Sequence, residues 1–165
     1  MRVAWSGHRP DLFLQPRVAR DTVLSTAREL LLHESVERFL VGGQRGVDTW
    51  AAHAAHMLGV PFGLLLPLPV SEFTADWTPA ERAELERTLH WATDVLLVGG
   101  EAEDAYTERN RLLATSGDLL VVVWTRRAGG GTAETVAFAR QVGTPIREIV
   151  LQPSLAAGSP DGRGL

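Results

Sequence analysis

The sequence predicts a three-layer α/β fold, in which a mainly parallel sheet of about six strands carries helices on both faces. Short apolar runs rich in β-branched residues alternate along the chain with longer segments of helical periodicity. Several of the apolar runs end in glycine-rich or polar turns. The length of 165 residues suits one domain with a single core.

Six short apolar segments are predicted as strands, because each is bounded by glycine, proline or polar residues. They cover residues 2–6, 38–42, 61–66, 94–98, 118–124 and 145–151. Strands that are joined by helices pair in parallel through right-handed crossovers. We therefore expect the strand ends at residues 6, 42, 98 and 124 to meet at one edge of the sheet, where open α/β folds bind ligands.

Five segments between these strands have apolar residues at helical spacing and are predicted as helices. They begin near residues 16, 47, 79, 106 and 132. Residues 67–78 are predicted as a long irregular loop, of the kind that often forms a lid. We expect one domain over residues 1–151, followed by a flexible tail over 152–165 that is rich in proline, glycine and serine.

The composition excludes several kinds of chemistry. The chain has no cysteine, and every one of its 16 basic residues is arginine. Thiolate nucleophiles, disulfides, a Walker lysine and a lysine Schiff base with pyridoxal phosphate are therefore excluded. The net charge of −4 gives no general attraction to nucleic acid or to anionic membranes. We expect a cytoplasmic protein with no cofactor and no metal, since no carboxylate lies at ligand spacing from His53 and His56.

The strongest candidate for an anion site is the turn Gly129-Gly130-Gly131-Thr132, which joins a buried strand to a helix. Glycines allow the backbone to approach a phosphate closely, and the first N–H groups of a helix have no partner inside it. Thr132 can either cap the helix or bind a phosphate oxygen. Taken alone, this turn fits two interpretations equally well: an anion site, and a flexible loop with an ordinary threonine cap.

Two further turns fall at the same predicted edge of the sheet. Gly7, His8 and Arg9 follow the first strand, and the second strand is followed by Gly42, Gly43 and Gly46 with Asp48 just beyond. Asp48 can cap the next helix or reach a ribose hydroxyl. The helix near residue 106 adds Arg109 and Asn110, which precede the strand that leads to the glycine turn. Tryptophans at positions 77 and 124 are candidates for stacking on a base.

Together, these turns and the helix between them resemble the SLOG superfamily, and within it the YspA/YpsA-like branch. The resemblance rests on residues 6–10, 42–52, 106–110 and 130–136 and covers roughly residues 2–150. It implies a Rossmann-like fold that binds nucleotides or nucleotide-derived ligands. Relatives include the LOG phosphoribohydrolases, which cleave nucleoside 5′-monophosphates, and the DNA-processing protein DprA.

The LOG pattern implies site residues, which carry over only in part. Its functional arginine matches Arg109, and its glycine-threonine turn matches Gly131 and Thr132. Its active-site glutamate falls on Thr135, whereas the glutamate of this chain is Glu134, about 100° away around the helix. The catalytic part of the LOG pattern is therefore incomplete in this chain, whereas its phosphate-binding turn is retained.

We accordingly expect the chain to bind a nucleoside 5′-phosphate or an ADP-ribose-like molecule through the Gly130–Thr132 turn. The alternative is a phosphoribohydrolase in which Glu134 and Arg109 take part in catalysis, since an oxocarbenium-like transition state needs a nearby carboxylate. Single-stranded DNA binding of the DprA kind is a weaker alternative, and a role as a structural subunit is compatible with ligand binding. A homodimer is also expected.

Overall fold

The structure is a computed structural model, which describes residues 1–155. All six strands pair in parallel in one sheet of order β4-β3-β2-β1-β5-β6. The strands are β1 (Arg2–Gly7), β2 (Arg38–Val41), β3 (Phe62–Leu66), β4 (Asp94–Leu97), β5 (Leu119–Trp124) and β6 (Ile146–Val150). The predicted fold class is confirmed.

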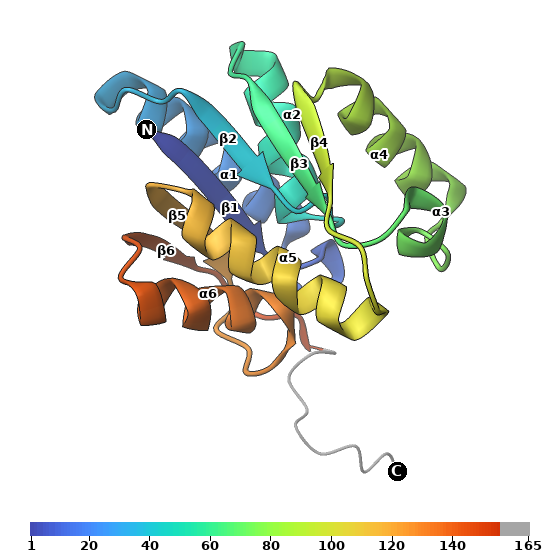
Figure 1. The fold of residues 1–165 in the computed structure, drawn as a ribbon. Coiled ribbons are helices and arrows are strands. Elements are labelled where there is room, and N and C mark those ends of the chain that lie inside the picture. The colour runs from blue at the N-terminus through green and yellow to red at the C-terminus, as the bar shows by residue number, and fades with distance from the viewer. Residues whose placement is uncertain (156–165) are drawn as a thin grey trace.

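The helices are α1 (Pro16–His33), α2 (Val47–Leu58), α3 (Val70–Phe73), α4 (Pro79–Trp91), α5 (Ala102–Ser116) and α6 (Gly130–Val142), with a short 3-10 helix at Pro10–Leu12. In Figure 1, α5 and α6 lie together on the near face of the sheet, while α1 and α2 lie behind it. The sheet is therefore the middle of three layers.

Alternate residues of β1 enter different cores, because successive side chains of a strand point to opposite faces. Val3 and Trp5 are fully buried in the larger core, which includes residues of α1 and α2. Ala4 is fully buried in a second core with Leu113 and Ala114 of α5. The central strands are apolar on both faces for this reason.

The chain changes direction across the sheet between β1 and β5. From β1 it moves outward through β2 and β3 to β4, and it then returns to the other side of β1 to form β5 and β6. The connections that leave β1 and β5 consequently lie on opposite faces (Figure 1). Such a switch point opens a crevice beyond the carboxyl ends of the two strands, where ligands of α/β folds bind.

Two segments of the structure differ from the sequence-based prediction. The stretch 67–78 is not wholly irregular but contains α3, and both Phe73 and Trp77 are buried against α4 residues such as Leu85. Helix α5 begins at Ala102, one turn before the predicted start. Sequence patterns missed α3 because it is only four residues long and is held by tertiary packing.

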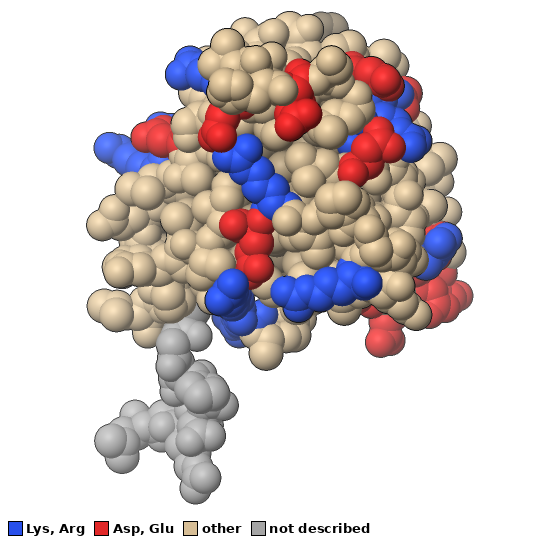
Figure 2. All heavy atoms as spheres, turned by 90° about the vertical axis from the view of Figure 1, so that its left-hand side faces the viewer, with Lys and Arg blue, Asp and Glu red and all other residues tan. Residues whose placement is uncertain are grey.

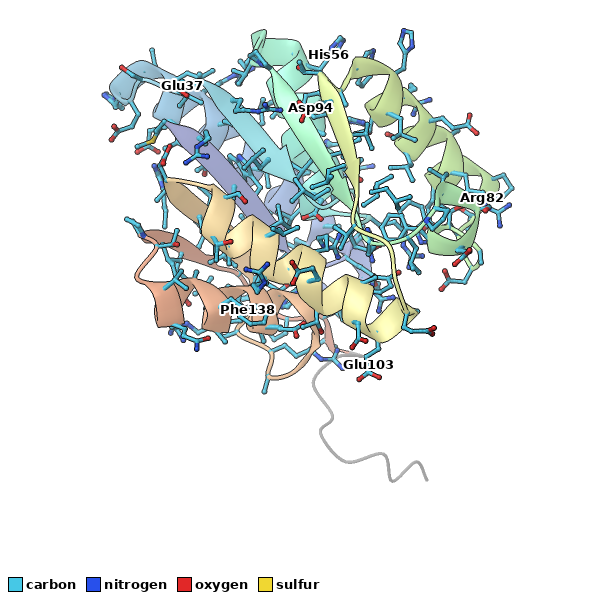
Figure 3. All side chains as sticks on the ribbon, viewed as in Figure 1. Glu37, His56, Arg82, Asp94, Glu103 and Phe138 are labelled. Atoms are coloured by element: carbon cyan, nitrogen blue, oxygen red, sulfur yellow. The ribbon has the colours of Figure 1, made fainter. Side chains whose placement is uncertain are left out.

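The edge strand β4 is partly exposed in the described part of the chain. Val95, Leu96 and Leu97 of β4 are each about half exposed, and among the described residues β4 pairs only with β3. Asp94, which Figure 3 labels at the start of this strand, forms an ion pair with Arg38 of β2. This pair crosses β3 above Gly63, where a Cβ atom would lie 2.6 Å from the Arg38 guanidinium.

The beginning of the predicted tail is held in place. The Leu14 N–H donates to the Gln152 carbonyl at 3.0 Å, and the Ser154 N–H donates to the Leu12 carbonyl at 3.0 Å. Residues 156–165 of the predicted tail lie outside the described part of the chain.

Acidic and basic side chains are intermixed on the face that Figure 2 shows, which is the left-hand side of Figure 1.

None of the helices in residues 1–155 combines the length and the apolar character that crossing a membrane requires.

Candidate functional site

A cavity of about 430 Å³ opens at the carboxyl ends of β1 and β5, at the switch point of the sheet. This volume falls within the range of small-molecule sites. Its walls come from the turn after β1, the turn after β2, helix α5 and the turn that leads into α6. The lining residues are Ser6, Gly7, His8, Arg9, Leu12, Gln44, Asp48, Tyr106, Arg109, Asn110, Leu113, Arg127, Ala128, Gly129, Gly130, Gly131 and Thr132.

The amino end of α6 faces this cavity without a cap. The helix begins at Gly130, and its N-cap Gly129 has no side-chain cap hydrogen bond in the described part of the chain. Gly129 and Gly130 have φ of 76° and 80°, a conformation that favours glycine. Thr132 lies inside the helix and is not its cap. The free N–H groups and the helix dipole leave a site suited to an anion.

The loop before α6 is anchored where it leaves β5. Arg126 adopts a φ of 60°, and its Nε donates to Oε1 of Glu148 on β6 at 2.6 Å. The Trp124 indole donates to the same oxygen at 3.0 Å. Arg127, the next residue, carries no such ion pair among the described residues and lines the cavity.

Arg109 brings a positive charge into the interior of the site. Only 5% of its surface is exposed. Its Nε donates to Oδ1 of Asn110 at 2.9 Å and its Nη1 donates to the carbonyl of Gly42, while the Tyr106 ring lies 5.7 Å from its guanidinium carbon. Burial lowers the pKa of Arg109 and Asp48 acts in the opposite direction, but an arginine stays charged at neutral pH.

Asn110 and Glu134 connect Arg109 to α6. The Asn110 side-chain nitrogen donates to Oε2 of Glu134 at 2.9 Å, and the Thr107 hydroxyl donates to its Oε1 at 2.9 Å. Both oxygens of Glu134 thus accept hydrogen bonds from α5, and Glu134 does not line the cavity. In this structure it positions Asn110 and, through it, Arg109.

Asp48 is the one acidic residue among those that line the cavity, and it is 5% exposed. Its Oδ2 accepts a hydrogen bond from the Gln44 N–H at 3.2 Å. Burial raises the pKa of Asp48 to about 6, although Arg109 and the backbone of Gln44 and Gly42 act in the opposite direction. Asp48 does not cap α2, whose N-cap is Gly46 with no side-chain cap.

His8 lines the cavity beside Arg127 and is 5% exposed. Its Nε2 is buried and has no hydrogen-bond partner among the described residues. Burial lowers the pKa of His8 to about 4, and the charge of Arg127 adds to this effect. The imidazole is therefore neutral at physiological pH and offers one donor and one acceptor nitrogen.

The structure brings most of the predicted ligand residues together around this cavity. Those that line it are Gly7, His8, Arg9, Asp48, Arg109, Asn110, Gly130, Gly131 and Thr132. Gly42, Gly43 and Gly46 do not. Gly42 instead leaves room for Arg109 and Asp48, since a Cβ atom there would lie 2.5 Å from Nη1 and 2.8 Å from Oδ2. Gly46 lines a neighbouring cavity of about 280 Å³.

Several lining residues were not predicted as site residues. Gln44 lies inside the second glycine motif, Tyr106 lies one turn before Arg109, and Arg127 directly precedes the glycine turn. Each of them lies close in the sequence to a predicted site residue, and this closeness is the signal that could have identified it. The two tryptophans proposed for base stacking do not line the cavity, because Trp77 packs against Phe73 and Trp124 is only 6% exposed.

Thr135 occupies the position where the LOG pattern has its glutamate. It is buried, and its hydroxyl donates to the Gly131 carbonyl at 2.8 Å. No carboxylate stands at this position in the chain.

No protein-family model matches the sequence, and no curated protein does. Among solved structures, the chain is similar to DNA processing protein A (DprA) from Streptococcus pneumoniae, with a TM-score of 0.67 and 18% sequence identity. The match covers 89% of this chain and 49% of that one, so the chain spans about half the length of DprA. At this identity the likeness concerns the fold. The chain therefore has the Rossmann-like fold of DprA, which is the fold expected of the SLOG superfamily.

Proposed function

We propose that the chain binds a nucleotide or a nucleotide-derived ligand in the cavity between β1 and β5, with a phosphate of the ligand at the amino end of α6. The observation that carries this proposal is the start of α6, which has no side-chain cap and lines the same cavity as the buried guanidinium of Arg109. Backbone N–H groups and a guanidinium are the standard partners of a phosphate.

The charges of the cavity favour an anionic ligand. Arg9, Arg109 and Arg127 line it, against the single carboxylate of Asp48. The dipole of α6 adds about half a positive charge at Gly130. A phosphate monoester, which carries up to two negative charges, complements this balance. His8 adds a buried, unpartnered nitrogen in the same wall.

The fold supports the placement of the site. In doubly wound sheets, ligands lie in the crevice outside the carboxyl ends of the strands that flank the switch point, here β1 and β5.

The sequence motifs favour membership of the YspA/YpsA-like branch of the SLOG superfamily.

A thermal-shift series with AMP, GMP, NAD and ADP-ribose tests this proposal. At least one of these ligands should stabilise the protein, because a ligand at about 100 times its Kd adds about 2.7 kcal/mol. Arg127→Ala should weaken the effect. Arg140→Ala is the matched control, since it removes the same charge near the carboxyl end of α6 and Arg140 does not line the cavity. Equal shifts in the two variants, or none with any ligand, would contradict the proposal.

Hydrolysis of a bound nucleoside 5′-monophosphate is the second candidate, because the cavity contains one carboxylate, Asp48. Release of free base, measured by chromatography, distinguishes an enzyme from a binding module. Salt-sensitive binding to oligonucleotides in place of nucleotides would instead favour the nucleic-acid alternative.

A further inference from the structure

The position of Asp48 constrains what the ligand of this cavity must carry. The carboxylate is buried in the wall of a cavity whose other charged residues are arginines. A negative charge in this place weakens the binding of any anion that lacks a hydrogen-bond donor near it, because like charges repel more strongly where water is excluded. A ligand that binds here is therefore expected to carry a hydrogen-bond donor near Asp48, because this contact offsets the repulsion between the two negative charges.

The contacts of Asp48 leave part of its acceptor capacity unused. Backbone N–H groups of the turn after β2 approach it, with the Gln44 N–H at 3.2 Å from Oδ2. No side chain in residues 1–155 donates a hydrogen bond to it, and it forms no ion pair with Arg109. An ionised carboxylate has about four acceptor sites, so sites remain for a ligand.

Asp48 and Arg109 lie on either side of Gly42 and attract each other electrostatically, but among the described residues they form no ion pair. Nη1 of Arg109 donates to the Gly42 carbonyl, and Oδ2 of Asp48 lies on the same side of this residue. Each charge is thus held by the backbone of the turn. Both remain available to one ligand, the guanidinium for an acidic group and the carboxylate for a donor.

From these contacts we infer that Asp48 accepts hydrogen bonds from hydroxyl groups of the ligand, and that the cavity selects a phosphorylated sugar over a phosphorylated acid. The inference rests on the proposed function, since it requires a phosphate at the start of α6. A ribose 5-phosphate unit has a phosphate at one end and hydroxyl donors toward the other. A phosphorylated carboxylic acid of similar size brings a second anion toward Asp48 and is repelled.

Titration calorimetry near neutral pH with three probes tests the inference: inorganic phosphate, ribose 5-phosphate and 3-phosphoglycerate. The unmodified protein should bind ribose 5-phosphate more tightly than 3-phosphoglycerate. In Asp48→Asn, the affinity for ribose 5-phosphate should fall about tenfold, since a hydrogen bond to a charged group is worth about 1.5–3 kcal/mol. The affinity for 3-phosphoglycerate should rise, and that for inorganic phosphate should not fall.

Asp11→Asn is the matched control. Asp11 is exposed, pairs with Arg9 at 3.8 Å and does not line the cavity. This variant removes the same charge near the site, so it should change the affinities for all three probes in the same direction and preserve their ratios. Circular dichroism and thermal unfolding establish that both variants are folded.

The outcomes separate the two proposals. If the unmodified protein binds none of the probes and no nucleotide, the proposed function fails and this inference fails with it. If phosphate binds but ribose 5-phosphate has no advantage over 3-phosphoglycerate, the inference is wrong and the proposed function stands. The inference is also wrong if Asp48→Asn lowers all affinities equally, because Asp48 would then only order the turn after β2.

Discussion

Glu134 accepts a hydrogen bond from the side-chain amide of Asn110, with 2.9 Å between Oε2 and Nδ2. The oxygen of the same amide accepts from Nε of Arg109. A carboxylate on α6 therefore fixes which way the amide points, and the amide in turn holds the guanidinium. Asn110 links Glu134 and Arg109, the two residues predicted to take part in catalysis. Arg109 and Asn110 line the cavity, whereas Glu134 does not.

Replacing Glu134 should therefore affect the orientation of Arg109 more than any chemical step. Glu134→Ala leaves Asn110 and Thr107 without their acceptor and should cost about 1–3 kcal/mol of stability, together with ligand affinity. Glu134→Gln keeps one acceptor for Asn110 and can donate to the Thr107 hydroxyl, so it should retain most of both. Chemical denaturation and titration calorimetry measure the two effects. If the unmodified protein hydrolyses a nucleotide and Glu134→Gln abolishes this activity, Glu134 acts as more than a positioning residue.

Gly42→Ala should damage the site, although Gly42 itself does not line the cavity. The new Cβ would lie 2.5 Å from Nη1 of Arg109 and 2.8 Å from Oδ2 of Asp48, so both side chains must move. We expect a loss of about 1–3 kcal/mol in stability and a clear loss of ligand affinity. Gly59→Ala, where no atom lies within 4 Å of the new Cβ, is the control. It should cost some stability, because φ is 71°, but no affinity.

The pH dependence of stability should contain two opposing contributions. The pKa of His8 falls from 6.5 to about 4 on folding, so the unfolded chain binds more protons and stability rises with pH between about 4 and 6.5. The pKa of Asp48 rises from 3.8 to about 6, so the folded chain binds more protons and stability falls between about 4 and 6. Each contribution is about 3 kcal/mol, and the two largely cancel.

Replacing either residue should reveal the pH dependence of stability that the other one causes. Relative to the unmodified protein, Asp48→Asn should gain stability as pH rises from about 4 to 6, whereas His8→Asn should lose stability over the same interval. Urea unfolding at a series of pH values measures both differences. Parallel curves for the three proteins would show that neither group titrates as described.

Introducing the LOG-type glutamate at residue 135 should not create an enzyme. Thr135 is 1% exposed, and its hydroxyl bonds to the Gly131 carbonyl. Thr135→Glu would bury an unpaired carboxylate in tightly packed surroundings, at a cost of several kcal/mol. We expect a marked loss in the thermal midpoint, while Thr135→Ser, which keeps the hydroxyl, should unfold close to the unmodified protein. A stable Thr135→Glu variant that releases base would contradict the structure.

The fold class and the parallel pairing could be predicted from sequence because strand and helix patterns are local, and because parallel pairing places the ends of β1 and β5 on one edge. The order of the strands was not predicted. The contribution of Gly42 could not be foreseen, since it depends on the approach of Arg109 from a helix 67 residues later. Tryptophan is a residue type that can stack on a base, but Trp77 packs in a core with Phe73 of α3. The role of Glu134 likewise depends on α5 and α6 packing side by side.

The contact between Arg126 and Glu148 limits the length of backbone that a ligand at the start of α6 would have to order. Its contact with Glu148 fixes the point where the loop leaves β5, and α6 begins at Gly130, so the free segment comprises Arg127 to Gly129. Fixing the backbone of one residue costs about 1–2 kcal/mol in conformational entropy. Because this segment is short, a ligand bound at the start of α6 would order little additional backbone.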